Sequence, residues 1–303
     1  MWVGLAFLSA LLLGLYDVAK KRSLGGNAVI PVLLLNTLFS SLIFLPVILS
    51  AELQLGWFEG TSLEGDTGSI AEHSLVALKA LITLSSWLCG YFAIKHLPLT
   101  IVGPVNATRP VVVLIGATLL FGERLNMWQW GGVLLTILSL YLLSIAGRKE
   151  NINFKQSRHV WALFAAMLLG AVSGLYDKYI ISTHELNPTF VQSWFSIYQL
   201  VMMTIIASVV WLPKRTTERF EWRWTIPLIS LFVSCADFCY YHALDMEGSM
   251  IAIVSMIRRS SVIVTFLCGA LLFGERNLRT KASPRCRTRG SAGRSEKSGA
   301  HCA

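Results

Sequence analysis

The sequence predicts an all-α integral membrane protein with about nine transmembrane helices. Of its 303 residues, 54% are hydrophobic and only 14% are charged, whereas soluble domains carry roughly 25% charged residues. The apolar residues fall in runs of about 20, the length that crosses a bilayer core of about 30 Å. Each run is expected to be a helix, because backbone groups inside lipid must pair within their own segment.

Nine runs are expected to span the membrane, and short loops join most of them. The longest loop, residues 50–74, contains five acidic residues and neither lysine nor arginine. The expected spans are residues 2–18, 28–49, 75–95, 97–120, 127–147, 159–181, 189–212, 225–244 and 249–272.

Loop charges predict the orientation of these spans. The loops on one side, residues 19–27, 95–96, 148–158 and 213–224, hold twelve lysines and arginines, and the loops on the other side hold only Arg124. Because positive loops remain cytoplasmic, we expect the N-terminus and the acidic loop outside. The net charge of +9 therefore reflects the cytoplasmic loops and a basic tail rather than a nucleic-acid partner.

Several short motifs occur twice, which indicates an internal repeat. Arg109 matches Arg259 at an offset of 150 residues, and Tyr91 matches Tyr241 at the same offset. The sequence GLYD stands at Gly14–Asp17 and Gly174–Asp177, and FGER stands at Phe121–Arg124 and Phe273–Arg276.

Two copies of one unit are therefore expected, residues 1–147 and 159–278, with a cytoplasmic linker at 148–158. The first copy has five spans, an odd number, so the second enters the membrane from the other side. Secondary transporters built from such inverted repeats place their substrate site near the bilayer midplane between the repeats.

The fourth helix of each repeat ends in FGER, where we expect Gly122 to permit a turn and Glu123 to lie at the water interface. Two five-helix repeats with this Gly-Glu step resemble the EamA branch of the drug/metabolite transporter superfamily, over residues 1–278. The resemblance implies an exporter or exchanger of small metabolites in the cell (inner) membrane. It does not imply one substrate, because the family's substrates vary widely.

Charged side chains inside the bilayer cost at least about 2.5–3.5 kcal/mol and are candidate functional groups. Arg109 lies in the middle of the fourth span with Asn106 on the same face, and Pro104 and Pro110 flank them and predict a break in the helix. Arg258 and Arg259 are their counterparts in the ninth span, pointing about 100° apart on a helix. Arginines from both repeats would suit a carboxylate or phosphate of the substrate.

The alternative is that each arginine pairs with an acid inside the membrane and only holds the bundle together. Asp237, near the middle of the eighth span, could pair with Arg258 or Arg259, or could exchange a proton during transport. Asp17 and Asp177 are further candidates for such pairing.

The two GLYD motifs add further candidates for substrate contact. Tyr16, Asp17, Tyr176 and Asp177 could line a pocket, or the tyrosines could belong to an interfacial belt. Gly14 and Gly174 are expected to permit close helix approach. Trp87 could form part of an aromatic wall, and Lys79 is expected to extend outward from the start of the third span.

The sequence contains no signature of a soluble enzyme, a metal site or a nucleotide cofactor. We therefore expect no enzyme, no cofactor and no nucleic-acid partner. The expected function is a lipid-embedded, secondary-active transporter of a small metabolite, and the arginines would suit an anionic one. Protons or a counter-substrate could drive it. The rival interpretation is a non-transporting membrane assembly or receptor component.

Residues 279–303 are polar, basic and rich in glycine and serine, a composition typical of disorder. They stand where the repeat predicts a tenth helix. The last helix of the second repeat is therefore expected to be missing, which leaves open a transporter inactivated by its loss.

Overall fold

The computed structural model describes eight main stretches of helix and their connections. Within them every regular element is helical, and six helices are long and apolar enough to cross a membrane. The predicted all-α membrane fold is therefore confirmed. The described residues are 1–24, 27–96, 105, 108–128, 130–135, 138, 158–214, 220–261 and 263–264.

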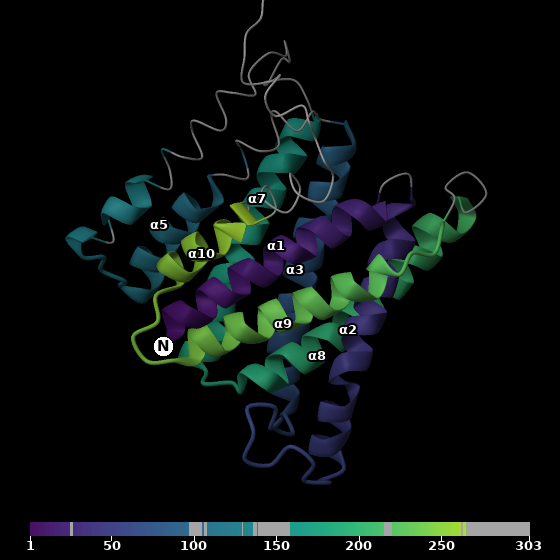
Figure 1. Cartoon of the computed structure of the whole chain (residues 1–303), viewed down its shortest axis with the longest axis horizontal. Coiled ribbons are helices and arrows are strands. Elements are labelled where there is room, and N and C mark those ends of the chain that lie inside the picture. The colour runs from purple at the N-terminus through teal and green to yellow at the C-terminus, as the bar shows by residue number, and fades with distance from the viewer. Residues whose placement is uncertain are drawn as a thin grey trace, which may run out of the picture.

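The predictions for Asn106, most of the 148–158 linker and residues 265–303, with the second FGER and the tail, fall outside the described residues. The helices are α1 (Trp2–Leu24), α2 (Val29–Glu52), α3 (Ile70–His96), α5 (Arg109–Phe121), α7 (Arg158–Lys178), α8 (Pro188–Ile206), α9 (Thr225–Asp245) and α10 (Ile251–Arg259) (Figure 1). Wider π-helical turns continue two of them, η1 (Tyr179–Thr183) after α7 and η2 (Ala207–Trp211) after α8, and η3 (Leu212–Lys214) follows η2.

Local capping explains where two of the helices begin. Ser69 and Glu72 form a capping box at α3: the Ser69 N–H donates to Glu72 Oε2 at 2.6 Å and the Glu72 N–H donates to Ser69 Oγ at 3.3 Å. The third span therefore begins at Ile70, five residues before the predicted start. At α8, Asn187 Oδ1 accepts from the N–H groups of Thr189 and Phe190, and Pro188 occupies a first-turn position that needs no donor.

The helices pack in pairs that span the two halves of the chain. Helix α1 packs along α9, and α3 packs along α7. Helix α2 packs against α8, and α5 packs against α10. In Figure 1, α2 and α8 lie at the lower right, α5 and α10 at the left, and α1 and α3 run between them.

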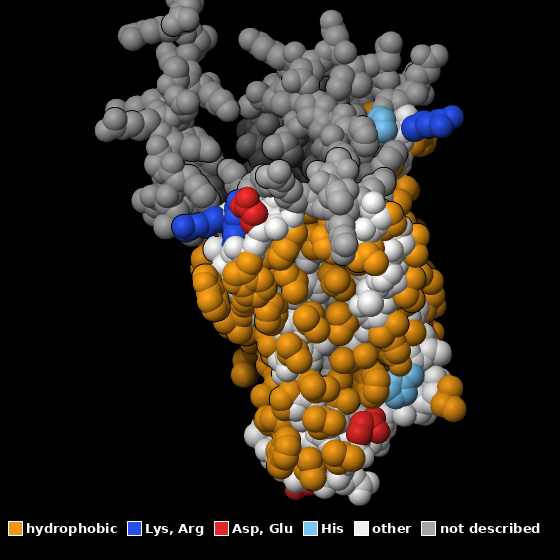
Figure 2. All heavy atoms as spheres, turned by 90° about the vertical axis from the view of Figure 1, so that its right-hand side faces the viewer, with side chains coloured by type: hydrophobic (Ala, Val, Ile, Leu, Met, Phe, Trp, Pro, Cys, Tyr) orange, Lys and Arg blue, Asp and Glu red, His pale blue; other side chains and the backbone are white. Residues whose placement is uncertain are grey.

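The outer surface is apolar, as a lipid-facing surface must be. Leu119 is 78% exposed, Val209 70% and Phe7 56%. Figure 2 shows one face of the molecule covered largely by hydrophobic side chains, with few charged groups, near its ends.

Loops from distant parts of the sequence meet at the two ends of the bundle. The acidic loop, residues 53–69 in the structure, receives hydrogen bonds from the start of α8, where Thr189 Oγ1 donates to the Ser62 carbonyl at 2.9 Å. At the other end, Asn27 Nδ2 donates to the Glu221 carbonyl at 2.7 Å and Arg223 donates to the Arg22 carbonyl at 2.6 Å.

Both spans that carry the matching arginines are interrupted at those arginines. Helix α5 begins at Arg109, and Pro110 stands in its first turn. Helix α10 ends at Arg259, and Ser260 forms a turn before helix resumes at Ser261. Pro110 thus starts a helix rather than kinking one, since a first-turn proline costs no backbone hydrogen bond.

The first FGER does more than end a helix. Gly122 terminates α5 with a left-handed φ of 62°, as its predicted turn requires. Glu123, however, is buried, and its carboxylate accepts from the Ile251 N–H at 2.7 Å and the Ala252 N–H at 3.3 Å. The predicted place of Glu123 at the water interface is therefore wrong, because the first turn of α10 needs acceptors for its N–H groups.

Candidate functional site

A cavity of about 400 Å³ lies at the centre of the bundle. All eight of the α-helices that the structure describes contribute to its walls. The sequence predicted a site near the bilayer midplane between the two repeats, and helices from both halves of the chain line this cavity. Small-molecule sites are typically concave spaces of roughly 300–1,000 Å³, so this cavity is the candidate site.

Three arginines from the two interrupted spans reach this cavity. Arg109, at the start of α5, and Arg258 and Arg259, at the end of α10, all line it. The charge of Arg259 lies within electrostatic range of both Arg109 and Arg258, which repel it, and of Asp17, which attracts it. An anion entering the cavity would relieve this repulsion.

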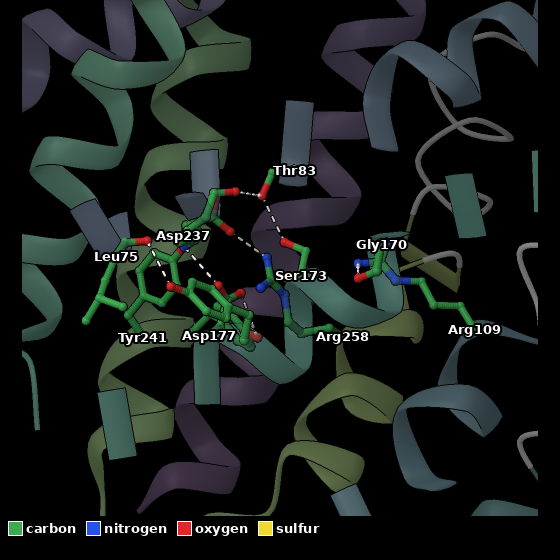
Figure 3. A network of polar contacts seen from close by, with 12 residues as sticks. Leu75, Thr83, Arg109, Gly170, Ser173, Asp177, Asp237, Tyr241 and Arg258 are labelled. Carbon is green, nitrogen blue, oxygen red and sulfur yellow. Dashed lines mark hydrogen bonds and ion pairs between the residues drawn. The ribbon is translucent and has the colours of Figure 1, made fainter. Parts of the chain in front are cut away.

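Arg109 is held by a glycine of α7. Its Nη2 donates to the Gly170 carbonyl (Figure 3). A Cβ at position 170 would lie 2.8 Å from Arg109 Cζ, so a larger residue there would displace the guanidinium from this position.

Arg258 makes the ion pair that the sequence suggested for it. Its Nη2 lies 2.6 Å from Asp237 Oδ1 (Figure 3), and its guanidinium lies 4.0 Å from the centroid of the Tyr240 ring. The pairing of Asp237 with Arg258 is confirmed. Arg258 is therefore restrained by α9, while Arg259, one position on, has a different electrostatic environment.

A second charged pair joins α3 and α7. Lys79 Nζ lies 3.0 Å from Asp177 Oδ1, and both side chains are buried. Lys79 also donates to the Tyr241 hydroxyl, and Tyr240 donates to Asp177 Oδ2 at 3.2 Å. The predicted outward direction of Lys79 is wrong: since α3 begins at Ile70, Lys79 lies more than two turns inside the helix and cannot reach its end.

The charges that line the cavity are predominantly positive. The basic residues are Lys20, Lys79, Arg109, Arg258 and Arg259, and the acidic residues are Asp17, Asp177 and Asp237. Among the described residues that line it, five positive against three negative charges leave +2 around the cavity.

The other predicted site residues differ in whether they line the cavity. Tyr16, Asp17 and Trp87 line the cavity. Tyr176 does not lie among its lining residues; its hydroxyl donates to the Leu75 carbonyl at 3.2 Å, because it points about 100° from Asp177 around α7.

The two GLYD glycines also differ from each other. A Cβ at Gly14 would clash with Val264, so the expected close helix approach is confirmed there. A Cβ at Gly174 would meet no atom of the described residues within 4 Å, and Gly174 instead lines the cavity. Within the described part of the chain, the predicted close approach is therefore not found at Gly174.

Sequence reasoning missed three amide side chains that line the cavity. They are Asn36 of α2 and Gln192 and Gln199 of α8, each at most 5% exposed. The available signal was an uncharged amide inside an apolar span, which is costly to bury unless it has a partner.

Comparisons with known proteins bear on both fold and family. A solved crystal structure matches this chain with a TM-score of 0.63 at 15% identity, covering 92% of this chain and 90% of that one. This likeness concerns the fold alone. A search of curated proteins finds no significant match.

The family comparison is more specific. Residues 1–145 match the EamA-like transporter family. Members of this family move small molecules across membranes, which agrees with a multi-pass helical bundle around a polar cavity. The match supports membership of the EamA-like transporter family and covers residues 1–145, the part of the chain that holds the first predicted repeat.

Proposed function

We propose that this chain is a secondary-active transporter that exports or exchanges a small organic anion by alternating access. The observation that carries the proposal is the convergence of Arg109, Arg258 and Arg259 on one central cavity. Three guanidinium groups in a low-dielectric space repel one another. An anion with several oxygen acceptors would bind all three with charge-assisted hydrogen bonds.

The packing of the helices supports two inverted copies of one unit, residues 1–147 and 159–278. In such a repeat, each helix of the first half has an equivalent in the second half: α1 corresponds to α7, α2 to α8, α3 to α9 and α5 to α10. The repeat therefore predicts that a contact between α1 and α9 has an equivalent between α7 and α3, and both pairs are in contact. Rocking of such related halves about a fixed site is a recurrent mechanism of alternating access.

The loop charges support a cell-membrane protein with its N-terminus outside and the positive end of the bundle cytoplasmic. The substrate's passage is driven by exchange or by an ion gradient. When the substrate anion binds Arg258, it displaces the Asp237 carboxylate from that arginine. Asp237 is therefore the acid that can take up a proton during the cycle.

A thermal-stabilisation screen of the purified protein with small carboxylates and phosphates tests the proposal. At least one anion is expected to raise the melting temperature of the wild type, and Arg259→Gln is expected to weaken that anion's binding tenfold or more. A screen in which neutral and cationic solutes stabilise the protein and anions do not would reject an anionic substrate.

A further inference from the structure

The cavity has a second polar wall, which the arginines do not explain. It is formed by Asn36, Gln192 and Gln199, the three buried amides of α2 and α8, here called the amide wall. Ser40 and Ser196, from the same two helices, line the cavity beside it.

Each amide of this wall has one polar atom without a hydrogen-bond partner in the described part of the chain. These atoms are Asn36 Oδ1, Gln192 Oε1 and Gln199 Nε2. A buried polar group without a partner destabilises the folded protein, and such groups are uncommon in native structures. Three of them on one cavity therefore indicate a ligand that completes their hydrogen bonds.

The contacts of Gln192 show which of its two polar atoms lacks a partner. Its Nε2 donates to the Ser234 carbonyl at 2.7 Å, so the amide nitrogen is engaged and the oxygen is the atom left over. Each amide carries an acceptor oxygen and a donor nitrogen, so the wall offers both kinds of hydrogen-bonding group. A hydroxyl group matches such a surface, because it both donates and accepts.

The amide wall and the arginines come from different helix pairs. The amides come from α2 and α8, which pack on each other, and the arginines come from α5 and α10, which also pack on each other. Figure 1 shows these two helix pairs at opposite sides of the bundle, with α1 and α3 between them.

We infer that the occupant of this cavity is a bifunctional small molecule, a polyhydroxylated organic anion. Its anionic group binds at the arginines, and its hydroxyl groups bind at the amide wall. The side chains of Phe44, Trp87 and Phe195 line the same space and provide apolar surface for the carbon chain. This inference rests on the proposed function, since it takes the arginines as the anion site.

Three probes of similar length separate the two ends of the site. Gluconate carries a carboxylate and five hydroxyl groups, hexanoate carries the carboxylate alone, and sorbitol carries hydroxyl groups without a charge. Each is titrated against the purified full-length protein, with its melting temperature as the readout of binding. Gluconate is expected to bind at least tenfold more tightly than either of the other two.

The variants assign that preference to the amide wall. Gln192→Met is expected to weaken gluconate binding by about threefold to tenfold, the effect of one or two hydrogen bonds, and to leave hexanoate binding unchanged. Asn36→Leu provides an independent variant with the same expectation. Gln54→Met, a change of an exposed glutamine in the acidic loop, is the matched control and should leave all three titrations unaltered.

The outcomes distinguish this inference from the proposed function. Equal binding of gluconate and hexanoate, or a gluconate preference that survives both Gln192→Met and Asn36→Leu, would overturn the amide wall as a hydroxyl site. If Arg259→Gln still weakened both carboxylates in that case, the anion transporter would stand. If neither carboxylate bound but a phosphate in the screen did, only the amide wall would fall; if no anion stabilised the protein, both proposals would fall.

Discussion

Lys79 and Asp177 hold opposite charges in the interior, with Lys79 1% and Asp177 6% exposed. Taking either charge out of water is unfavourable, so each depends on the other and on the hydroxyls of Tyr241 and Tyr240. The same reasoning applies to Arg258 and Asp237, whose atoms lie 2.6 Å apart. At the scale of single residues, the site thus contains two ion pairs, Lys79 with Asp177 and Arg258 with Asp237. Around Arg109 and Arg259, by contrast, positive charges lie near each other.

Lys79→Met and Asp177→Leu, made singly, should each destabilise the protein by about 3–5 kcal/mol, because each leaves a buried charge without its counter-ion. The double variant should recover much of that loss, since both charges are then absent. Thermal unfolding in one detergent measures all three. Strictly additive losses in the double variant would show that the two residues do not act as a pair.

Gly170→Ala should displace the Arg109 guanidinium, because the added methyl would lie 2.8 Å from Arg109 Cζ. We expect anion binding to fall by about tenfold, the effect of a misplaced charged hydrogen bond of about 1.4 kcal/mol. Gly4→Ala is the matched control, since a Cβ there would meet nothing within 4 Å. Unchanged anion binding in Gly170→Ala would remove Arg109 from the site.

At the scale of elements, the two interrupted spans and their caps form one connected unit. Helix α5 ends at Phe121, and two residues later Glu123 caps the first turn of α10, which itself ends at Arg259. Lys178 Nζ adds to this junction by donating to the Ser249 carbonyl at 2.7 Å. Burial raises the pKa of the Glu123 carboxyl, and the N–H groups of Ile251 and Ala252 counteract that shift.

Glu123→Ala should destabilise the protein by about 0.5–2 kcal/mol, the usual effect of losing a helix cap. The backbone amides of Ile251 and Ala252 should then exchange with deuterium faster. Arg124→Ala, a change of the exposed neighbour, is the control and should leave their exchange unaltered. Equal protection of these amides in both variants would contradict the capping role of Glu123.

The sequence predicts these elements unevenly. The break in the fourth span could be inferred from its prolines, and the pairing of Arg258 with Asp237 from two charges buried in apolar runs. The capping of α10 by Glu123 could not, because the contact joins residues 128 positions apart. The depth of Lys79 was misjudged because the Ser69–Glu72 capping box, visible in the sequence, moves the start of α3 outward.

At the scale of the whole molecule, composition is enough to predict a helical membrane bundle, whereas the two related halves that the recurring motifs indicate stay a prediction. The shape of the cavity depends on how those halves pack. The wall made by α2 and α8 could not be predicted from motifs, since Asn36, Gln192 and Gln199 recur in no pattern that the repeat reveals. Their role follows only from the packing that buries them together.

Orientation is a property of the whole molecule that cysteine labelling can measure. Ser62→Cys in the acidic loop should react with a membrane-impermeant maleimide added to intact cells. Glu221→Cys, at the opposite end of the bundle, should react only after the cells are made permeable. If Glu221→Cys reacted in intact cells and Ser62→Cys only in permeable ones, the proposed topology would be inverted. Labelling of the unsubstituted chain measures the background from its own cysteines.

Transport itself is tested most directly by counterflow in proteoliposomes, using the anion that stabilises the purified protein best. Vesicles preloaded with that anion and containing the wild-type chain should accumulate the labelled anion from outside. Vesicles containing Arg259→Gln at equal protein content should accumulate at least tenfold less. Wild-type vesicles that accumulate no more than protein-free ones, or Arg259→Gln vesicles that match the wild type, would contradict transport of an anion through the arginine-lined cavity.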